Sequence, residues 1–154
     1  MNKYIAITIG DINGIGLEIL INSWKKKQIK KFIVFSNIKI IKKYFKKKNL
    51  VSDLNIIDIK KKNYNYQINK INIYSFNAKS LEDNTYNSLK FAYNFCKLKI
   101  CSGIITLPLR KDLIRNKISK SFIGHTEYFQ KIDKKKYSNM ILFHKKIIVS
   151  PITT

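Results

Sequence analysis

Residues that crosslink or bend a chain are scarce in this sequence of 154 residues, which has two cysteines, two prolines and five glycines. Cys96 and Cys101 form no CxxC pair and no His/Cys cluster with the spacing of metal ligands, so we expect both to be small buried side chains. No apolar run reaches the ~18 residues of a membrane span. The first residues lack the basic and apolar segments of a signal peptide. These absences predict a cytoplasmic protein with no membrane partner.

Acidic residues and arginine are also few. Nine Asp and Glu face 31 Lys and Arg, which gives a formal net charge of +22, and the only arginines are Arg110 and Arg115. Such a charge is typical of proteins that bind polyanions, but a nucleic-acid-binding protein gathers its charge on one element and favours arginine for bidentate contacts. A coding bias toward A+T-rich codons also explains it. The lysine runs are scattered, at residues 25–27, 46–48, 60–62 and 134–136. We therefore expect no specific nucleic-acid partner.

The hydrophobic pattern alternates between short β-branched runs and segments with helical spacing. Strands are predicted at residues 4–9, 32–35, 54–59, 71–76, 103–107, 139–143 and 146–152, and helices at residues 16–27, 38–48, 81–99 and 111–117. This order is typical of an α/β fold with an open, mostly parallel sheet and flanking helices. We expect residues 71–76 to form an edge strand, and residues 1–154 to form a single partial α/β unit.

Three segments carry residues suited to chemistry. Residues 10–16 (G-D-I-N-G-I-G) lie between a predicted strand and helix, where backbone amides can meet an anion. Their spacing differs from the G-x-G-x-x-G of dinucleotide sites, so a tight turn is the favoured interpretation on these residues alone. Residues 106–111 follow a strand end, where α/β sheets place their ligands. Thr106 and Lys111 can both point into that crevice. For Lys111, a solvent-exposed surface position is an equally good interpretation.

The third segment is residues 124–127 (G-H-T-E), before a short helical stretch. A histidine can move a proton or donate a hydrogen bond to phosphate near neutral pH, and the neighbouring hydroxyl adds a second donor. The alternative is that Thr126 caps the helix and His125 has no role. His144 has no partner in the sequence and is interpreted as a turn residue.

In order and surroundings, these segments resemble one family, the 4-hydroxythreonine-4-phosphate dehydrogenases of pyridoxal phosphate biosynthesis. The similar segments are residues 5–11 with Gly14, Gly16 and Glu18; residues 103–106 with Pro108 and Lys111; Phe122 with residues 124–127; and residues 139–142 with the strand that leads to Thr154. The joint pattern covers almost the whole chain and is far more specific than any one segment.

The resemblance implies a homodimeric fold of the isocitrate and isopropylmalate dehydrogenase type. It implies oxidation of 4-phosphohydroxy-threonine with NAD or NADP and a divalent metal (Zn, Mg or Co), after which the 3-oxo product loses carbon dioxide to give 3-amino-2-oxopropyl phosphate. In that family the His-Thr pair contacts the phosphorylated substrate, so this role is carried onto His125 and Thr126. Asp11 and Lys111 match recurrent family positions and are possible site residues.

The sequence also departs from the family pattern. Ile12 and Leu17 stand where the family usually has proline, and Arg110 replaces a smaller polar residue. Family members continue past the equivalent of Thr154 with a histidine that is the first of three metal ligands. We therefore expect a truncated dehydrogenase, corresponding to the N-terminal half. It would be inactive alone, with an exposed apolar edge at residues 139–154. A basic nucleic-acid-binding module and a non-catalytic phosphate-ligand binder remain the alternatives.

Overall fold

Five strands form one sheet in the computed structural model, which describes residues 3–151 apart from the side chains of residues 62 and 63. The strand order is β3-β4-β2-β1-β5, and every neighbouring pair is parallel. The strands are β1 (Tyr4–Thr8), β2 (Phe32–Phe35), β3 (Leu54–Ile56), β4 (Ile71–Tyr74) and β5 (Cys101–Thr106). The predicted α/β class with an open parallel sheet is therefore confirmed.

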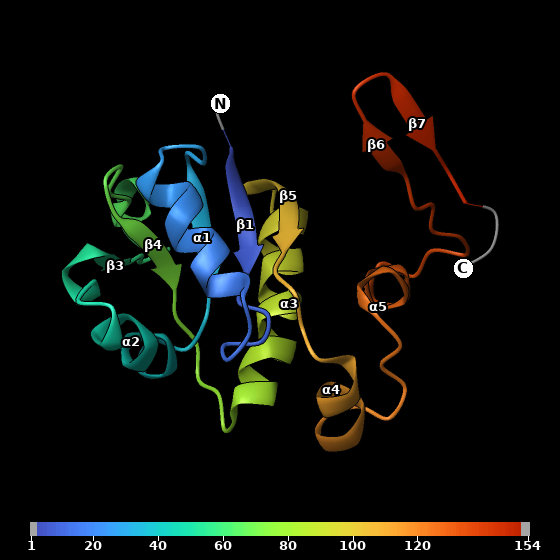
Figure 1. Ribbon diagram of the computed structural model, residues 1–154, viewed down its shortest axis with the longest axis horizontal. Coiled ribbons are helices and arrows are strands. Elements are labelled where there is room, and N and C mark those ends of the chain that lie inside the picture. Colours follow the sequence, from blue (N-terminus) through green and yellow to red (C-terminus); the bar gives the residue numbers. More distant parts are fainter. Residues whose placement is uncertain (1–2, 152–154) are drawn as a thin grey trace.

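Helices cover both faces of the sheet (Figure 1). On one face lie α1 (Gly16–Lys25) and α2 (Ile38–Lys47), and on the other lies α3 (Leu81–Lys97). Beyond the sheet, α4 (Lys111–Lys117) and α5 (His125–Ile132) pack with α3, and the 3-10 turns are η1 (Val51–Asp53) and η2 (Lys62–Asn65). Side chains alternate along each strand, so β2 supplies both cores. Phe32 and Val34 pack with α1 and α2, whereas Ile33 and Phe35 pack with α3. A third cluster, around Tyr128, joins α3, α4 and α5.

Side-chain caps fix where α2 and α3, two of the helices beside the sheet, begin. Ser80 Oγ accepts a hydrogen bond of 3.1 Å from the Asp83 amide at the start of α3. Asn37 Oδ1 accepts two amides in the first turn of α2, at 2.9 and 3.2 Å. These bonds satisfy amides that have no partner inside the helix. Asn84 of α3 also accepts the Asn37 amide at 2.7 Å, so the starts of α2 and α3 are tied together.

Two predictions about the strands are wrong. Residues 71–76 were expected at an edge, but β4 lies between β3 and β2 and its side chains Ile71 and Ile73 are fully buried. The third predicted strand, residues 54–59, is shorter, because β3 pairs with β4 only over Leu54–Ile56 and forms the edge itself. A short edge strand presents few unpaired backbone groups to solvent.

The last described segment is an antiparallel hairpin of β6 (Leu142–His144) and β7 (Ile147–Val149), which stands apart from the five-stranded sheet (Figure 1). His144 was predicted in a turn but ends β6, where it pairs with Ile147. All residues of both strands are exposed, including Phe143 and Ile148. The predicted exposed apolar segment is thus present up to residue 151, and residues 152–154 lie outside the described part. Among residues 3–151, no helix has the length and apolar character needed to cross a membrane.

Candidate functional site

The carboxyl ends of β1 and β5 lie side by side and lead into two of the segments predicted to carry chemistry, residues 10–16 and 106–111. Thr8 at the end of β1 is the register partner of Thr106 at the end of β5. The helix that follows β1 lies on one face of the sheet and the helix that precedes β5 lies on the other. Strand connections therefore diverge between β1 and β5, and this is where open α/β sheets form a ligand crevice.

The loop after β1 is held against the turn after β5. Gly10 has a φ of 61°, and a Cβ added there would lie 2.4 Å from the Pro108 carbonyl oxygen. Glycine adopts this left-handed conformation at the lowest cost, and any residue with a Cβ would clash with the Pro108 carbonyl. The next amide, of Asp11, donates to the same Pro108 oxygen at 2.8 Å. The first and second predicted segments are therefore in direct contact.

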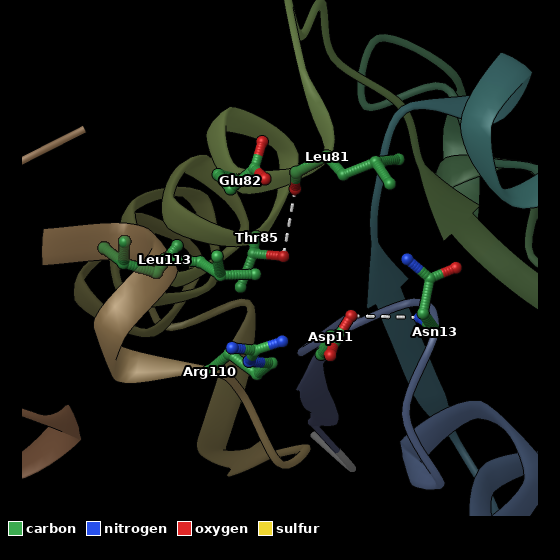
Figure 2. A pocket seen from close by; sticks show the side chains of 8 residues that line it. Asp11, Asn13, Leu81, Glu82, Thr85, Arg110 and Leu113 are labelled. Carbon is green, nitrogen blue, oxygen red and sulfur yellow. Dashed lines mark hydrogen bonds between the residues drawn. The ribbon is translucent and has the colours of Figure 1, made fainter. Parts of the chain in front are cut away.

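A small pocket of about 30 Å³ opens between these loops and the start of α3 (Figure 2). Asp11 and Arg110 face each other across it in Figure 2, and Thr85 lies on the α3 side. Asp11 Oδ1 accepts the Asn13 amide at 3.0 Å, which turns the loop back on itself. The pKa of Arg110 is raised mainly by its hydrogen bond to Asp112, at 2.6 Å, and to a smaller extent by Asp11. The pocket thus has a carboxylate on one wall and a guanidinium on the other.

Lys111 and the segment at residues 124–127 lie next to each other. A Cβ added to Gly124 would be 3.9 Å from Lys111 Cδ, in ordinary van der Waals contact. His125 follows as the first residue of α5, and Phe122 and Tyr128 anchor the segment by packing with Ile114 of α4. The structure therefore brings Lys111 and His125 together. Asp11 lies across the pocket from Arg110, which is the residue before Lys111.

His125 is partly buried, and its Nε2 atom is shielded from solvent without a hydrogen-bond partner among the described residues. Burial is the main cause that lowers the pKa of His125. The Glu127 carboxylate opposes the shift, and the Lys111 ammonium adds to it. Below its ordinary pKa of about 6.5 a histidine becomes cationic. His125 is therefore neutral at physiological pH, so one ring nitrogen donates and the other accepts.

Two other sequence predictions concern threonines. The alternative in which Thr126 caps the helix is wrong, since Gly124 is the capping residue and α5 has no side-chain cap. Thr126 lies in the first turn with an exposed side chain, adjacent in sequence to His125. Thr106 shares its register with Thr8, and neither side chain lines the pocket in Figure 2. Of Thr106 and Thr126, Thr126 is the exposed one, and it lies beside the histidine.

Sequence reasoning missed Thr85, which lines the pocket from α3. The signal was the row of small polar residues Asn84, Thr85 and Ser88 on the helix face that also carries the buried Leu89 and Ala92. A larger open hollow of about 700 Å³ lies between the starts of α2 and α3, and none of the predicted site residues lines it.

The described residues do not fit a metal ion. Within residues 3–151, no three His, Cys, Asp or Glu side chains gather at a spacing that would hold one. Residues 10–16 also lack the spacing of a dinucleotide fingerprint. The local chemistry is instead that of a lysine, a neutral histidine and an exposed hydroxyl around a short turn, groups that suit an oxyanion such as a phosphate ester.

Comparison with known proteins gives a family and a fold. The family described as pyridoxal phosphate biosynthetic protein PdxA matches residues 26–154. No curated protein sequence matches the chain significantly. The family match does not include residues 10–17, where Ile12 and Leu17 depart from the expected prolines.

Solved structures match over nearly the whole chain. One, provisionally described as 4-hydroxythreonine-4-phosphate dehydrogenase from Salmonella typhimurium, has a TM-score of 0.81 and 20% identity. The 4-hydroxythreonine-4-phosphate dehydrogenases from Klebsiella pneumoniae and Burkholderia phymatum give TM-scores of 0.77 and 0.75 with 21% and 20% identity. The match covers 97% of this chain in each case, and 50%, 50% and 49% of theirs. This chain thus spans about half the length of these structures and shares their fold.

Proposed function

This chain belongs to the family of the pyridoxal phosphate biosynthetic proteins PdxA, and from that premise we propose that it forms the N-terminal part of an NAD- or NADP-dependent 4-hydroxythreonine-4-phosphate dehydrogenase. In this proposal the 154 residues supply one wall of the substrate site, and the divalent metal and the nicotinamide bind mainly to groups beyond them. A homodimer is part of the same proposal. The chain alone is expected to give no turnover.

One observation carries the proposal for the substrate: the close approach of Gly124 to Lys111, which sets His125 beside a lysine. A phosphate ester carries up to two negative charges near neutral pH and accepts several hydrogen bonds. The Lys111 ammonium would pair with this charge as a mobile point donor. Thr126 would donate its hydroxyl, and the amides in the first turn of α5 lack a side-chain cap that would compete for them.

His125 would act here as a neutral group. Its lowered pKa keeps the ring uncharged, so it orients the ligand by donating one hydrogen bond without adding a second cation. Asp11 is a carboxylate on the other side of the turn, where it would accept a hydrogen bond from the ammonium group of an amino-acid substrate. When bound, a divalent metal would supply a Lewis acid for the alcohol, and a nicotinamide would supply the hydride acceptor. The described residues include neither a cluster of metal ligands nor a dinucleotide fingerprint, so both groups would be held mainly by residues beyond them.

Binding of O-phospho-L-threonine, a phosphorylated hydroxy-amino acid, tests the proposed site in the chain as it is. Calorimetric titration should give a measurable Kd for the wild type and a Kd about tenfold higher for Lys111→Met and for His125→Asn, since each removes a hydrogen bond to a charged group. Lys42→Met, at an exposed position of α2, and His144→Asn, in the exposed hairpin, are the matched controls. Equal losses in a control and its site variant would sink the assignment.

Activity is tested in a protein extended to the length of its relatives. Reduction of NAD or NADP with 4-hydroxythreonine 4-phosphate and a divalent metal should be seen there, and should fall with His125→Asn. Absence of turnover in the extended protein with every pairing of cofactor and metal would end the dehydrogenase proposal. Turnover by the 154 residues alone would show that the remaining machinery lies within them.

The proximity of Lys111 and His125 can be measured without a ligand. Because the Lys111 charge contributes to the lowered pKa of His125, Lys111→Met should raise that pKa, as read from the imidazole carbon shifts in an NMR titration. Lys42→Met should leave it unchanged. An unaltered His125 titration in Lys111→Met would place the two groups too far apart to share a ligand.

A further inference from the structure

The face of α3 beneath the pocket is polar where a helix against a sheet is normally apolar. Asn84, Thr85 and Ser88 expose only 1%, 6% and 0% of their surface. Residues of these types are seldom so deeply buried unless their polar atoms are bonded. Asn84 is bonded to the start of α2, and Ser88 Oγ donates to the Thr85 carbonyl within the helix at 2.7 Å. Thr85 alone among them reaches the loop after β1.

The Thr85 hydroxyl donates to the Gly10 carbonyl oxygen at 2.6 Å, across 75 residues of sequence. A second acceptor, the Leu81 carbonyl one turn earlier in the helix, is 3.1 Å away. A hydroxyl has one hydrogen, so the shorter bond takes most of it. The longer bond is the common local one for a threonine in a helix. The short bond therefore connects α3 to the loop after β1, and the helix itself does not require it.

The Gly10–Asp11 peptide region is consequently held from two directions. On one side Thr85 binds the Gly10 carbonyl, and on the other the Pro108 carbonyl accepts the Asp11 amide at 2.8 Å. Because both the C=O and the N–H of this one peptide group are bonded, the orientation of the Gly10–Asp11 peptide plane is restricted, and with it the direction of the Asp11 side chain. Asp11 faces Arg110 across the pocket in this orientation (Figure 2).

We propose that Thr85 is a positioning residue for the crevice: its hydroxyl locks the Gly10 carbonyl and thereby orients Asp11 toward the ligand space beside Arg110. The expected effect of the Thr85 hydroxyl on ligand binding rests on the proposed function, whereas its effect on the loop after β1 does not. Thr85 itself touches no ligand in this proposal. Valine has nearly the same shape without the hydroxyl, so Thr85→Val removes the bond to Gly10 and leaves the packing in place.

The amide exchange of Asp11 gives the direct test in the free chain. Thr85→Val should accelerate exchange at Asp11 by about fivefold to tenfold, the effect of losing one ordinary hydrogen bond. Thr85→Ser keeps the hydroxyl and should restore slow exchange. Ser88→Ala removes an equally buried hydroxyl whose bond stays within α3, so it controls for general loosening of the helix. In each variant, exchange in the middle of β1 reports whether the sheet itself has weakened.

Titration with O-phospho-L-threonine adds a functional arm, in which Thr85→Val should raise the Kd about threefold or more and Thr85→Ser should not. Asp11 exchange equal to wild type in Thr85→Val would overturn the proposal, and so would equal acceleration in Ser88→Ala. An unchanged Kd beside faster exchange would overturn the link to ligand binding. If the wild type fails to bind the probe while exchange responds as expected, the proposed function fails and the positioning of the loop stands.

Discussion

Replacing Gly10 with alanine tests the contact on which the whole crevice depends. Gly10 joins β1 to the first loop at a φ of 61°, with the Pro108 carbonyl oxygen 2.4 Å from where a Cβ would stand. Backbone, not a flexible side chain, occupies this space. The alanine variant therefore has to move the loop away from the turn after β5, and with it the Asp11 amide that binds Pro108 at 2.8 Å.

The cost follows from three terms. An alanine held in the left-handed region costs about 1–2 kcal/mol, and loss of the Asp11 hydrogen bond adds about 1 kcal/mol. The reduced entropy of the unfolded chain offsets about 0.4–1 kcal/mol. Gly10→Ala should thus lower the free energy of unfolding by about 2 kcal/mol, and the melting temperature by roughly 4–8 °C for a chain of this size.

Gly103→Ala is the matched control, because a Cβ added at Gly103 has no other atom within 4 Å and Gly103 has no positive φ. Its free energy of unfolding should stay within about 0.5 kcal/mol of the wild type, with a small gain expected because alanine loses less backbone entropy than glycine in a strand. Urea unfolding followed by circular dichroism measures both variants. If Gly10→Ala were as stable as Gly103→Ala, the close packing of the two loops would be refuted.

Three further predictions concern other parts of the molecule. Thr8 Oγ1 is buried with no hydrogen-bond partner in the described part of the chain, so Thr8→Val should raise the free energy of unfolding by about 1 kcal/mol in urea titrations; a loss would contradict this. Burial raises the pKa of the Cys101 thiol to about 12, so iodoacetamide at pH 8 should label the half-buried Cys96 first and reach Cys101 only after unfolding, as mass spectrometry would show. Phe143 and Ile148 of the hairpin are 70% and 67% exposed. Replacing both with serine should reduce self-association in light scattering and change the free energy of unfolding by less than about 0.5 kcal/mol. A loss of stability above about 1 kcal/mol would mean that the hairpin packs on the sheet.

Local pattern predicted the elements of the sheet well, because each buried strand is a short apolar run between polar turns. Residues 32–35 were predicted with their observed bounds, and Lys111–Lys117 likewise for α4. The place of β4 was missed because strand order depends on contacts between distant segments. The pattern of Ile71 and Ile73 is the same in an edge strand and in a central strand. Only the pairing of β3 with the outer side of β4 shows that β4 is not at the edge. The cap of α5 was missed because Gly124 supplies no side chain from which to recognise it.

The candidate site, too, could be predicted only in part from local sequence patterns. Gly10, Lys111 and His125 stood out because each belongs to a short segment with a recognisable composition. Thr85 did not, since its role rests on a bond to Gly10, far away in the sequence. Nothing in the local sequence distinguishes a threonine that binds its own helix from one that binds another element. Long-range hydrogen bonds of this kind become visible only when the fold brings both partners together.

The place of β1 between β2 and β5 has a consequence for folding during synthesis. Of the five described strands of the sheet, β1 is made first, yet β5, one of its two neighbours, is made after the other four. At typical translation rates the flank of β1 that awaits β5 stays open for roughly five to twenty seconds. During that interval its backbone groups are available to other nascent chains, so dense polysomes favour misassembly at this strand. Chaperone dependence should accordingly be greatest just before residues 101–106 leave the ribosome.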